Sequence, residues 1–433
     1  MVRDARVLLW GTVIGAVSWI EDRRLGVFQY TPSFAVSGVQ PAPLMMPLSG
    51  AVYEYPELDR GTFKGLPGLL ADSLPDRFGN ALINAWLAGQ QRSADSFSPV
   101  ERLCYVGKRG MGALEFEPAI LDGAPEERSV DLARLARLAA QILEKRLNIG
   151  GTLASDDEGQ ALRTILRVGT SAGGARAKAI LAWNPTTGEF RSGQGSSVEG
   201  FEHWLLKFDG VSGSSDPELI DSTGFGRIEF AYHRMAVAAG IRMTPCRLHE
   251  EGGRSHFMTR RFDRTETGAK LHMQSLGGMA HFDFRQPASH SYEQAIQVMR
   301  RLDLPRRDLE QMVLRAFFNV VARNCDDHVK NIAFLMDRAG SWSLSPAFDV
   351  TYAWNPSGEW TSEHQMSVNG KRDGHDREDL LSLAEYADVK RRKALELLDA
   401  VLAAVRGWPD HAAAAGVAEE RVRQVGSALR PGL

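Results

Sequence analysis

The stretch that decides the fold is Asn324-Cys325-Asp326-Asp327-His328-Val329-Lys330-Asn331. It sets a carboxylate at Asp326 and an amide at Asn331, with four residues between them, in a polar loop. Asp349 follows a predicted hairpin over residues 332–344. A phosphoryl-transfer site needs a carboxylate that orients the attacking hydroxyl and oxygen ligands that hold Mg²⁺ on the nucleotide phosphates. These three side chains supply both.

Two other interpretations fit parts of this stretch. An Asp-Asp-His run in a polar loop is typical of a turn with solvated carboxylates. Asp and His together also suggest a metalloenzyme, but no second His stands at the helical spacing that a zinc site needs. The combination of loop, hairpin and second acidic loop favours phosphoryl transfer.

Composition limits the class of protein. The chain has 433 residues, enough for one large domain or two to three smaller ones. With 43% hydrophobic and 24% charged residues it has the composition of a soluble globular protein, and its net charge of -3 gives no overall attraction to nucleic acid. The three cysteines, Cys104, Cys246 and Cys325, form no close pair, so we expect a reduced, cytoplasmic setting.

The apolar run over residues 7–20 has some features of a signal-peptide core. Gly11 and Gly15 interrupt it, and it lacks a small-x-small cleavage site. We therefore predict two short strands joined near these glycines, followed by a third strand over residues 26–30. No other stretch is long enough to span a bilayer, so we expect no membrane association.

Residues 1–125 alternate short apolar runs with Gly and Pro, which predicts a β-rich subdomain with a helix over residues 72–88. Residues 122–125 indicate a boundary. An amphipathic helix is predicted over residues 129–146. Beyond about residue 265 the pattern becomes helical, with a buried helix over residues 309–323 that delivers the Asp326 loop and a second helix over residues 390–405.

Residues 162–183 carry a second motif. An alternating run over residues 162–167 predicts a strand, residues 169–175 a glycine-rich turn, and residues 178–183 another strand. Glycine lets backbone N–H groups approach phosphates closely, so the turn is a candidate phosphate flap. Taken alone, the pattern favours an ordinary hairpin with a flexible tip over a nucleotide flap. A Walker A loop is excluded, since no Gly-Lys-Ser/Thr leads into a helix.

Lys207 lies in the apolar run over residues 203–208, which predicts a strand. Such a lysine either extends to the surface or is held inside by an anionic partner. Glu229, in a predicted helix over residues 229–239, is a candidate partner, although a solvated first-turn glutamate fits the sequence as well. Backbone groups of residues 260–262, at the end of a predicted strand, could pair with an adenine edge.

Five ordered segments of the chain together resemble the HipA-type toxin kinases. They are residues 171–178, 203–207, 261–264, 326–331 and 346–349, and the N-terminal Leu74-Pro75-Asp76 extends the likeness to nearly the whole chain. The resemblance implies an α+β, two-lobed protein-kinase-like fold, with a β-rich N-terminal lobe that carries an extra subdomain and a mostly helical C-terminal lobe. We expect the divisions 1–125, 126–264 and 265–433.

The resemblance also implies ATP and Mg²⁺ as cofactors and a role for each matching residue. Asp326 would be the catalytic carboxylate, and Asn331 and Asp349 the magnesium ligands. The implied ATP-binding residues are Ser171, Ala172, Gly173, Gly174, Ala175, Lys178, Lys207, Arg261, Phe262, His328 and Lys330. Ser171 matches a serine that family members autophosphorylate, and a dianion there would repel the phosphates of ATP.

Implied partners are a helix-turn-helix antitoxin of the HipB type and, through it, operator DNA. The implied substrate is a translation-related protein such as an aminoacyl-tRNA synthetase. Arg176, Ala177 and Asp327 depart from residues common in the family. Two alternatives stay open: a small-molecule kinase with the same constellation, and a catalytically idle scaffold that binds an antitoxin on DNA.

Overall fold

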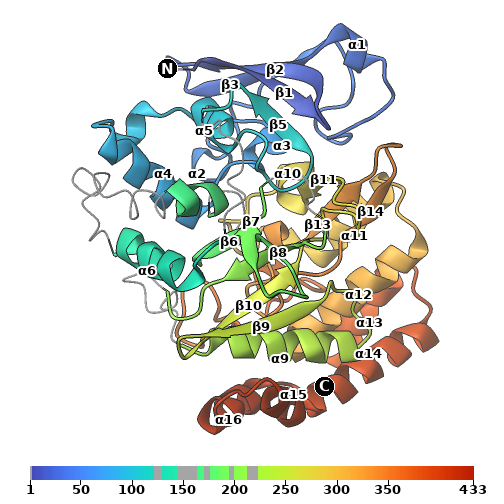
Figure 1. The fold of residues 1–433 in the computed structure, drawn as a ribbon. Coiled ribbons are helices and arrows are strands. Elements are labelled where there is room, and N and C mark those ends of the chain that lie inside the picture. Colours follow the sequence, from blue (N-terminus) through green and yellow to red (C-terminus); the bar gives the residue numbers. More distant parts are fainter. Residues whose placement is uncertain (1, 121–128, 145–162, 170–175, 195–198, 212–222) are drawn as a thin grey trace.

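A computed structural model describes residues 2–120, 129–144, 163–169, 176–194, 199–211 and 223–433. The described residues form an α+β protein in which a small N-terminal sheet, a second five-stranded sheet and a helical region follow one another along the chain (Figure 1). Within these ranges no helix is both long and apolar enough to cross a lipid bilayer.

The N-terminal subdomain is built on an antiparallel sheet with the strand order β4-β3-β2-β1-β5. Its strands are β1 (Asp4–Leu9), β2 (Thr12–Ile20), β3 (Leu25–Tyr30), β4 (Val52–Tyr53) and β5 (Leu114–Glu117). The predicted first hairpin is confirmed, and its turn lies at Trp10 and Gly11, which both have positive φ. Gly15 lies inside β2, where its missing Cβ leaves room for the Phe28 ring.

Most of the helices between β3 and β5 in the sequence contribute apolar residues to the core under this sheet or to two neighbouring clusters. The helices of this segment are α1 (Pro32–Ala35), α2 (Arg60–Phe63), α3 (Gly68–Ala71), α4 (Arg77–Gly89), η1 (Ala94–Ser96) and α5 (Pro99–Val106). The helix predicted over residues 72–88 begins later, at Arg77, because Asp76 takes the N-cap position and accepts the backbone N–H of Gly79. The predicted boundary at residues 122–125 lies outside the described residues.

The second sheet has the strand order β7-β6-β8-β10-β9. Its strands are β6 (Lys178–Trp183), β7 (Phe190–Ser192), β8 (Glu202–Lys207), β9 (Cys246–Glu251) and β10 (Arg254–Arg260). Helix α6 (Leu132–Leu143) shares a buried apolar cluster with this sheet, and helix α9 (Phe225–Ala238) packs against β9 and β10 (Figure 1).

The strand predicted over residues 162–167 is wrong: residues 163–168 are helical. Ile165, Leu166 and Val168 are buried in one apolar cluster with α4 and α6. A run of six residues is too short for its periodicity to separate a helical turn from a strand.

The C-terminal region surrounds one large apolar core. Its helices are α10 (Leu276–Ala280), α11 (Tyr292–Arg301), α12 (Arg306–Val321), α13 (Arg377–Tyr386), α14 (Arg391–Arg406), α15 (Trp408–Ala414) and α16 (Glu419–Ala428). A three-stranded sheet of β11 (His272–Ser275), β13 (Ala333–Met336) and β14 (Trp342–Leu344) lies beside them, and β12 (His290–Ser291) pairs with β15 (Met366–Ser367). As predicted, α12 is buried and leads directly into the Asp326 loop.

Candidate phosphotransfer site

Backbone and side-chain hydrogen bonds hold the loop after α12 in place. The Asn324 backbone N–H donates to the Asn319 carbonyl, and the loop ends in the short 3-10 helix η3 (Val329–Asn331). The Asn331 Nδ2 donates to the Asp326 carbonyl oxygen over 2.8 Å. The two ends of the predicted Asp-x-x-x-x-Asn motif are therefore in direct contact.

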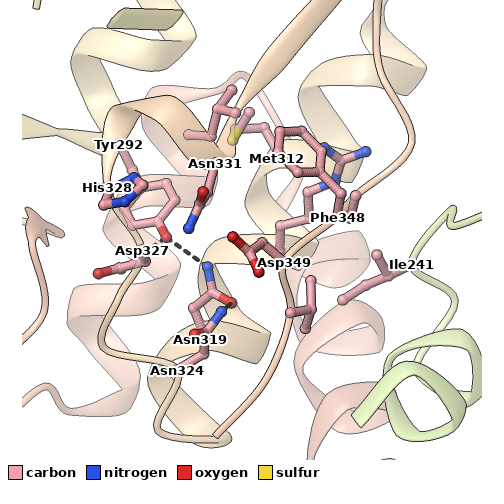
Figure 2. A pocket seen from close by; sticks show the side chains of 14 residues that line it. Ile241, Tyr292, Met312, Asn319, Asn324, Asp327, His328, Asn331, Phe348 and Asp349 are labelled. Carbon is pink, nitrogen blue, oxygen red and sulfur yellow. Dashed lines mark hydrogen bonds between the residues drawn. The ribbon is translucent and has the colours of Figure 1, made fainter. Parts of the chain in front are cut away.

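Asp327 anchors this loop to the C-terminal core. Its buried carboxylate accepts hydrogen bonds from the Tyr292 hydroxyl (2.9 Å) and the Gln365 backbone N–H (2.8 Å), and it lies 3.0 Å from His364 Nδ1. Tyr292 in turn accepts from Asn319, as the dashed line in Figure 2 marks. Asp327 is therefore a structural residue, although the sequence singled it out only as a departure from the family.

The charges of this anchor are coupled. Burial by itself would lower the pKa of His364, but the Asp327 carboxylate outweighs burial and raises it to about 10. Burial likewise opposes ionisation of Asp327, and the His364 ring overcomes it, so the pKa of Asp327 is held below its ordinary value. Asp327 and His364 therefore form a buried ion pair. Asp327 directly follows Asp326 in the sequence, so this pair fixes the chain next to Asp326.

Asp326 has a different environment. Half of its side-chain surface, 50%, is accessible, and its Oδ1 lies 3.8 Å from His328 Nε2. Desolvation raises the pKa of Asp326, and the negative charges of Asp349 and Asp327 add to this increase, while His328 opposes it. An accessible carboxylate with a raised pKa is suited to accept a hydrogen bond or proton from a hydroxyl.

Asp349 lies across the site from the loop, at a backbone position with φ 56°. Its Oδ1 is 2.5 Å from the Lys207 ammonium, which also contacts Glu229 Oε1 at 2.6 Å. Glu229 is 2% exposed, so the alternative prediction, a solvated glutamate in the first turn of a helix, is wrong. The two carboxylates outweigh the effect of burial and raise the pKa of Lys207, and Lys207 correspondingly lowers the pKa of Asp349 against the effect of burial.

Lys178 faces the same region from the neighbouring strand. It is the register partner of Lys207 in the β6–β8 pair. Its ammonium is buried and lies 2.7 Å from Asp76 Oδ2, at the N-cap of α4. The N-terminal subdomain thus contributes a carboxylate to the same strand pair that holds Lys207.

Three other side chains predicted to bind ATP, those of Arg261, Phe262 and Lys330, contact other protein residues. The Arg261 guanidinium is buried and forms a bidentate pair with Asp263, so in this structure it is directed toward that carboxylate. The Phe262 ring packs against Phe348 in a tilted arrangement with their centroids 5.3 Å apart, and the Lys330 ammonium lies 4.9 Å from the centre of the Phe284 ring.

The flap itself, including Ser171, Ala172, Gly173, Gly174 and Ala175, lies outside the described residues. Its neighbour Arg176 is described. The Arg176 guanidinium lies 3.8 Å from Glu229 and 4.5 Å above the Phe225 ring. The described chain therefore resumes, at Arg176, beside the glutamate that contacts Lys207.

The oxygen donors fit a hard divalent cation. Asn331 and Asp349 line one small cavity of about 30 Å³ together with His328 and Asn324 (Figure 2). No group of three His, Cys, Asp or Glu able to hold a metal occurs among the described residues. Two protein oxygens suit Mg²⁺, which is commonly held by one or two carboxylates together with substrate phosphates and water.

Comparison with known proteins agrees with this architecture. The model of the HipA N-terminal domain matches residues 5–117, and the model of the HipA-like C-terminal domain matches residues 170–408. Y4mE of Sinorhizobium fredii, whose name classes it as a kinase, is 25% identical over 126 residues, which cover 27% of this chain and 30% of that protein.

Among solved structures, HipA of Shewanella oneidensis MR-1, in a complex with HipB and its operator DNA, superposes with a TM-score of 0.66 at 16% identity. The match covers 98% of this chain and 95% of that one, so the folds are the same. The Helicobacter pylori proinflammatory kinase CtkA matches at a TM-score of 0.31 and 11% identity, over 52% of this chain and 92% of that one. Since the two domain models together cover most of the sequence and the fold agrees throughout, the chain belongs to the HipA family.

Proposed function

We propose that this protein is an ATP- and Mg²⁺-dependent serine/threonine protein kinase that acts as the toxin of a toxin–antitoxin pair. The observation that carries the proposal is that Asn331 and Asp349 line one cavity, where Asp349 contacts Lys207 beside Glu229. Asp326 adjoins this group, since its carbonyl accepts from Asn331 and the charge of Asp349 raises the pKa of its carboxylate. Asp326, Asn331 and Asp349 come from the C-terminal region, whereas Lys207 comes from strand β8 of the second sheet. Each of these side chains has a separate task in phosphoryl transfer.

In this proposal Asp326 accepts a hydrogen bond from the attacking hydroxyl and orients its oxygen toward the γ-phosphorus. Its raised pKa brings it closer to the range in which it can take up the hydroxyl proton as the new P–O bond forms and the bond between the γ-phosphorus and the bridging oxygen breaks, with ADP as the leaving group. Two carboxylates keep Lys207 cationic. When ATP binds, its phosphate oxygens compete with these carboxylates for the Lys207 ammonium. Mg²⁺ held by Asn331 and Asp349 would neutralise charge on the phosphates.

We further propose autophosphorylation of Ser171. The support for this proposal is that Arg176, five residues later in the sequence, lies 3.8 Å from Glu229, the partner of Lys207. A phosphate on Ser171 would add about two negative charges close to where ATP places its own, which opposes nucleotide binding.

Partners are proposed from the family alone. HipA of Shewanella oneidensis forms a complex with HipB and operator DNA, and the same fold extends over 98% of this chain. A helix-turn-helix antitoxin of the HipB type, and operator DNA through it, are the proposed partners. A translation-related protein such as an aminoacyl-tRNA synthetase is the proposed substrate.

The test is phosphate transfer from labelled ATP by the purified protein, with Asp326→Asn and Asp349→Ala as separate variants. Both variants are expected to lose transfer by at least about a thousandfold while their circular dichroism and unfolding curves stay close to wild type. Intact-mass analysis of the wild type is expected to show one added phosphate, located on Ser171. Retained turnover in both variants would remove this mechanism, and ATP binding without transfer to any protein would favour the scaffold alternative.

A further inference from the structure

Three cations from separate parts of the chain meet beside the catalytic loop. Lys64 is the exposed C-cap residue of α2. The Arg285 side chain packs against the same helix, since its guanidinium occupies the space that a Cβ on Gly61 would need. The residue before Arg285 is Phe284, and the Lys330 ammonium lies 4.9 Å above its ring. We call Lys64, Arg285 and Lys330 the basic cluster.

The basic cluster is attached to the proposed active site. Lys330 belongs to the same loop as Asp326 and lies within η3. The His328 ring, which contacts the Asp326 carboxylate, packs at 5.6 Å against the Phe284 ring. A substrate whose hydroxyl reaches Asp326 would therefore pass close to the cluster.

The positive charge of the cluster is not neutralised within the described part of the chain. None of its three members forms an ion pair there with a carboxylate. The two nearby carboxylates have other partners: Asp59 caps α2 through the Thr62 backbone N–H, and Asp283 accepts from the Thr62 hydroxyl and from the Arg285 and Gln286 N–H groups. Desolvation lowers the pKa of Lys64, and the neighbouring charges of Arg285, Arg102 and Lys330 lower it further, while the Asp59 carboxylate opposes this decrease.

We propose that the basic cluster binds carboxylates of an acidic segment that flanks the phosphoacceptor residue of the protein substrate. This inference rests on the proposed kinase function and adds a substrate preference to it. An acidic peptide suits the site because two or three carboxylates would pair with cations that form no ion pair among the described residues, at a short distance along the peptide from the acceptor hydroxyl.

A nucleic acid suits the same surface less well. Strong binding to a phosphate backbone usually requires about six to ten phosphate contacts. The basic cluster offers three cations, Asp59 and Asp283 lie next to it, and the whole chain has a net charge of -3. The cluster is thus matched to a short acidic stretch of polypeptide.

The test is a positional-scanning library of serine-centred peptides, with each flanking position fixed in turn as Glu, Gln or Lys, incubated with full-length protein and labelled ATP. Two double variants are compared with wild type. Lys64→Glu/Arg285→Glu changes two members of the cluster but leaves Lys330, a proposed ATP-binding residue, in place. Arg307→Glu/Arg392→Glu is the matched control, since it makes the same change of charge at two exposed arginines of α12 and α14.

Wild type and the control are expected to prefer Glu over Gln at one or more flanking positions by about tenfold in kcat/KM, an amount consistent with two to three favourable charge pairs. Lys64→Glu/Arg285→Glu is expected to lose this preference, while its peptide-independent ATP hydrolysis stays within about twofold of wild type.

Transfer without any preference for Glu in wild type, or an undiminished preference in the cluster variant, would overturn the inference and leave the kinase proposal intact. Tighter binding of a single-stranded oligonucleotide than of a Glu-rich peptide, lost in the cluster variant, would also overturn it. Absence of all ATP turnover in wild type would instead overturn the proposed function and this inference together.

Discussion

The Asp76 carboxylate lies 2.7 Å from the Lys178 ammonium, and this buried pair joins the N-terminal subdomain to the sheet that carries Lys207. Lys178 and Lys207 are opposite one another in register, so their side chains share one face of the sheet. Two ammonium groups at this spacing repel each other. Each has its own carboxylate partner, Asp76 for Lys178 and Glu229 for Lys207. The N-terminal subdomain therefore supplies, through Asp76, a negative charge that stabilises the pair of lysines.

Removal of the Asp76 carboxylate is expected to destabilise the whole protein. Asp76→Ala leaves Lys178 buried without this partner and removes the N-cap of α4, so we expect the free energy of unfolding to fall by about 3–5 kcal/mol. Urea unfolding monitored by circular dichroism measures the loss. The control is Asp131→Ala, which removes the N-cap of α6 without exposing a buried lysine and should cost only about 1 kcal/mol. Equal losses in the two variants would show that Asp76 acts as a cap alone.

Glu229 is expected to control ATP affinity through Lys207. In Glu229→Gln the ammonium keeps Asp349 as its charged partner, so it is held more firmly to that residue and is less available to phosphate oxygens. We expect the dissociation constant for ATP with Mg²⁺ to rise by about tenfold, equivalent to about 1.4 kcal/mol. Calorimetric titration measures it. Glu250→Gln, which alters an exposed glutamate paired with Arg227, is the control and should bind ATP as wild type does; equal affinity in all three proteins would contradict the role of Glu229.

Local sequence signals predicted much of the fold. The glycine at Gly11 between two apolar runs predicted the first hairpin, and the wide apolar face of residues 309–323 predicted the buried helix α12. The error at residues 163–168 arose where six residues gave no reliable period, and packing against α4 and α6 decided the structure there. Tertiary contacts of this kind have no signature in a short window.

The candidate site could be predicted only where its residues stand close together in the sequence. Asp326, Asn331 and Asp349 stand in an order typical of phosphotransferases, so a site that contains all three could be proposed from the chain alone. The anchoring role of Asp327 depends on His364, which is 37 positions away, and the Asp76–Lys178 pair spans 102 positions. Buried pairs between such distant residues become visible only when the fold brings them together.

The Asp327–His364 pair predicts a specific pH dependence of stability. The pKa of His364 rises from its ordinary value of 6.5 to about 10 in the folded protein, so the stability that this pair contributes is fully present below pH 6.5 and is lost as the pH rises to about 10. Other groups titrate in this range, so the useful quantity is the difference between wild type and His364→Gln, which can still donate a hydrogen bond to Asp327. This difference in unfolding free energy should be largest at pH 6 and should shrink through pH 8 to pH 10 in denaturant titrations. A difference that is the same at all three values would mean that His364 is uncharged in the folded state.

Arg261→Lys separates a structural role of Arg261 from nucleotide binding. The guanidinium donates to both oxygens of Asp263, from Nε over 2.8 Å and from a terminal nitrogen over 2.6 Å, and Asp263 in turn accepts from the Gly112 backbone N–H of the N-terminal subdomain. A lysine keeps the charge but cannot form this bidentate contact, so we expect the free energy of unfolding to fall by about 1–3 kcal/mol.

The affinity of Arg261→Lys for ATP should remain within about threefold of wild type at a temperature where the variant is folded, because the side chain is directed toward Asp263. Arg260→Lys, at the adjacent and more exposed position, is the matched control for stability and should unfold as wild type does. A loss of ATP affinity in Arg261→Lys without a loss of stability would restore Arg261 as a nucleotide ligand and would require its guanidinium to leave Asp263 when ATP binds.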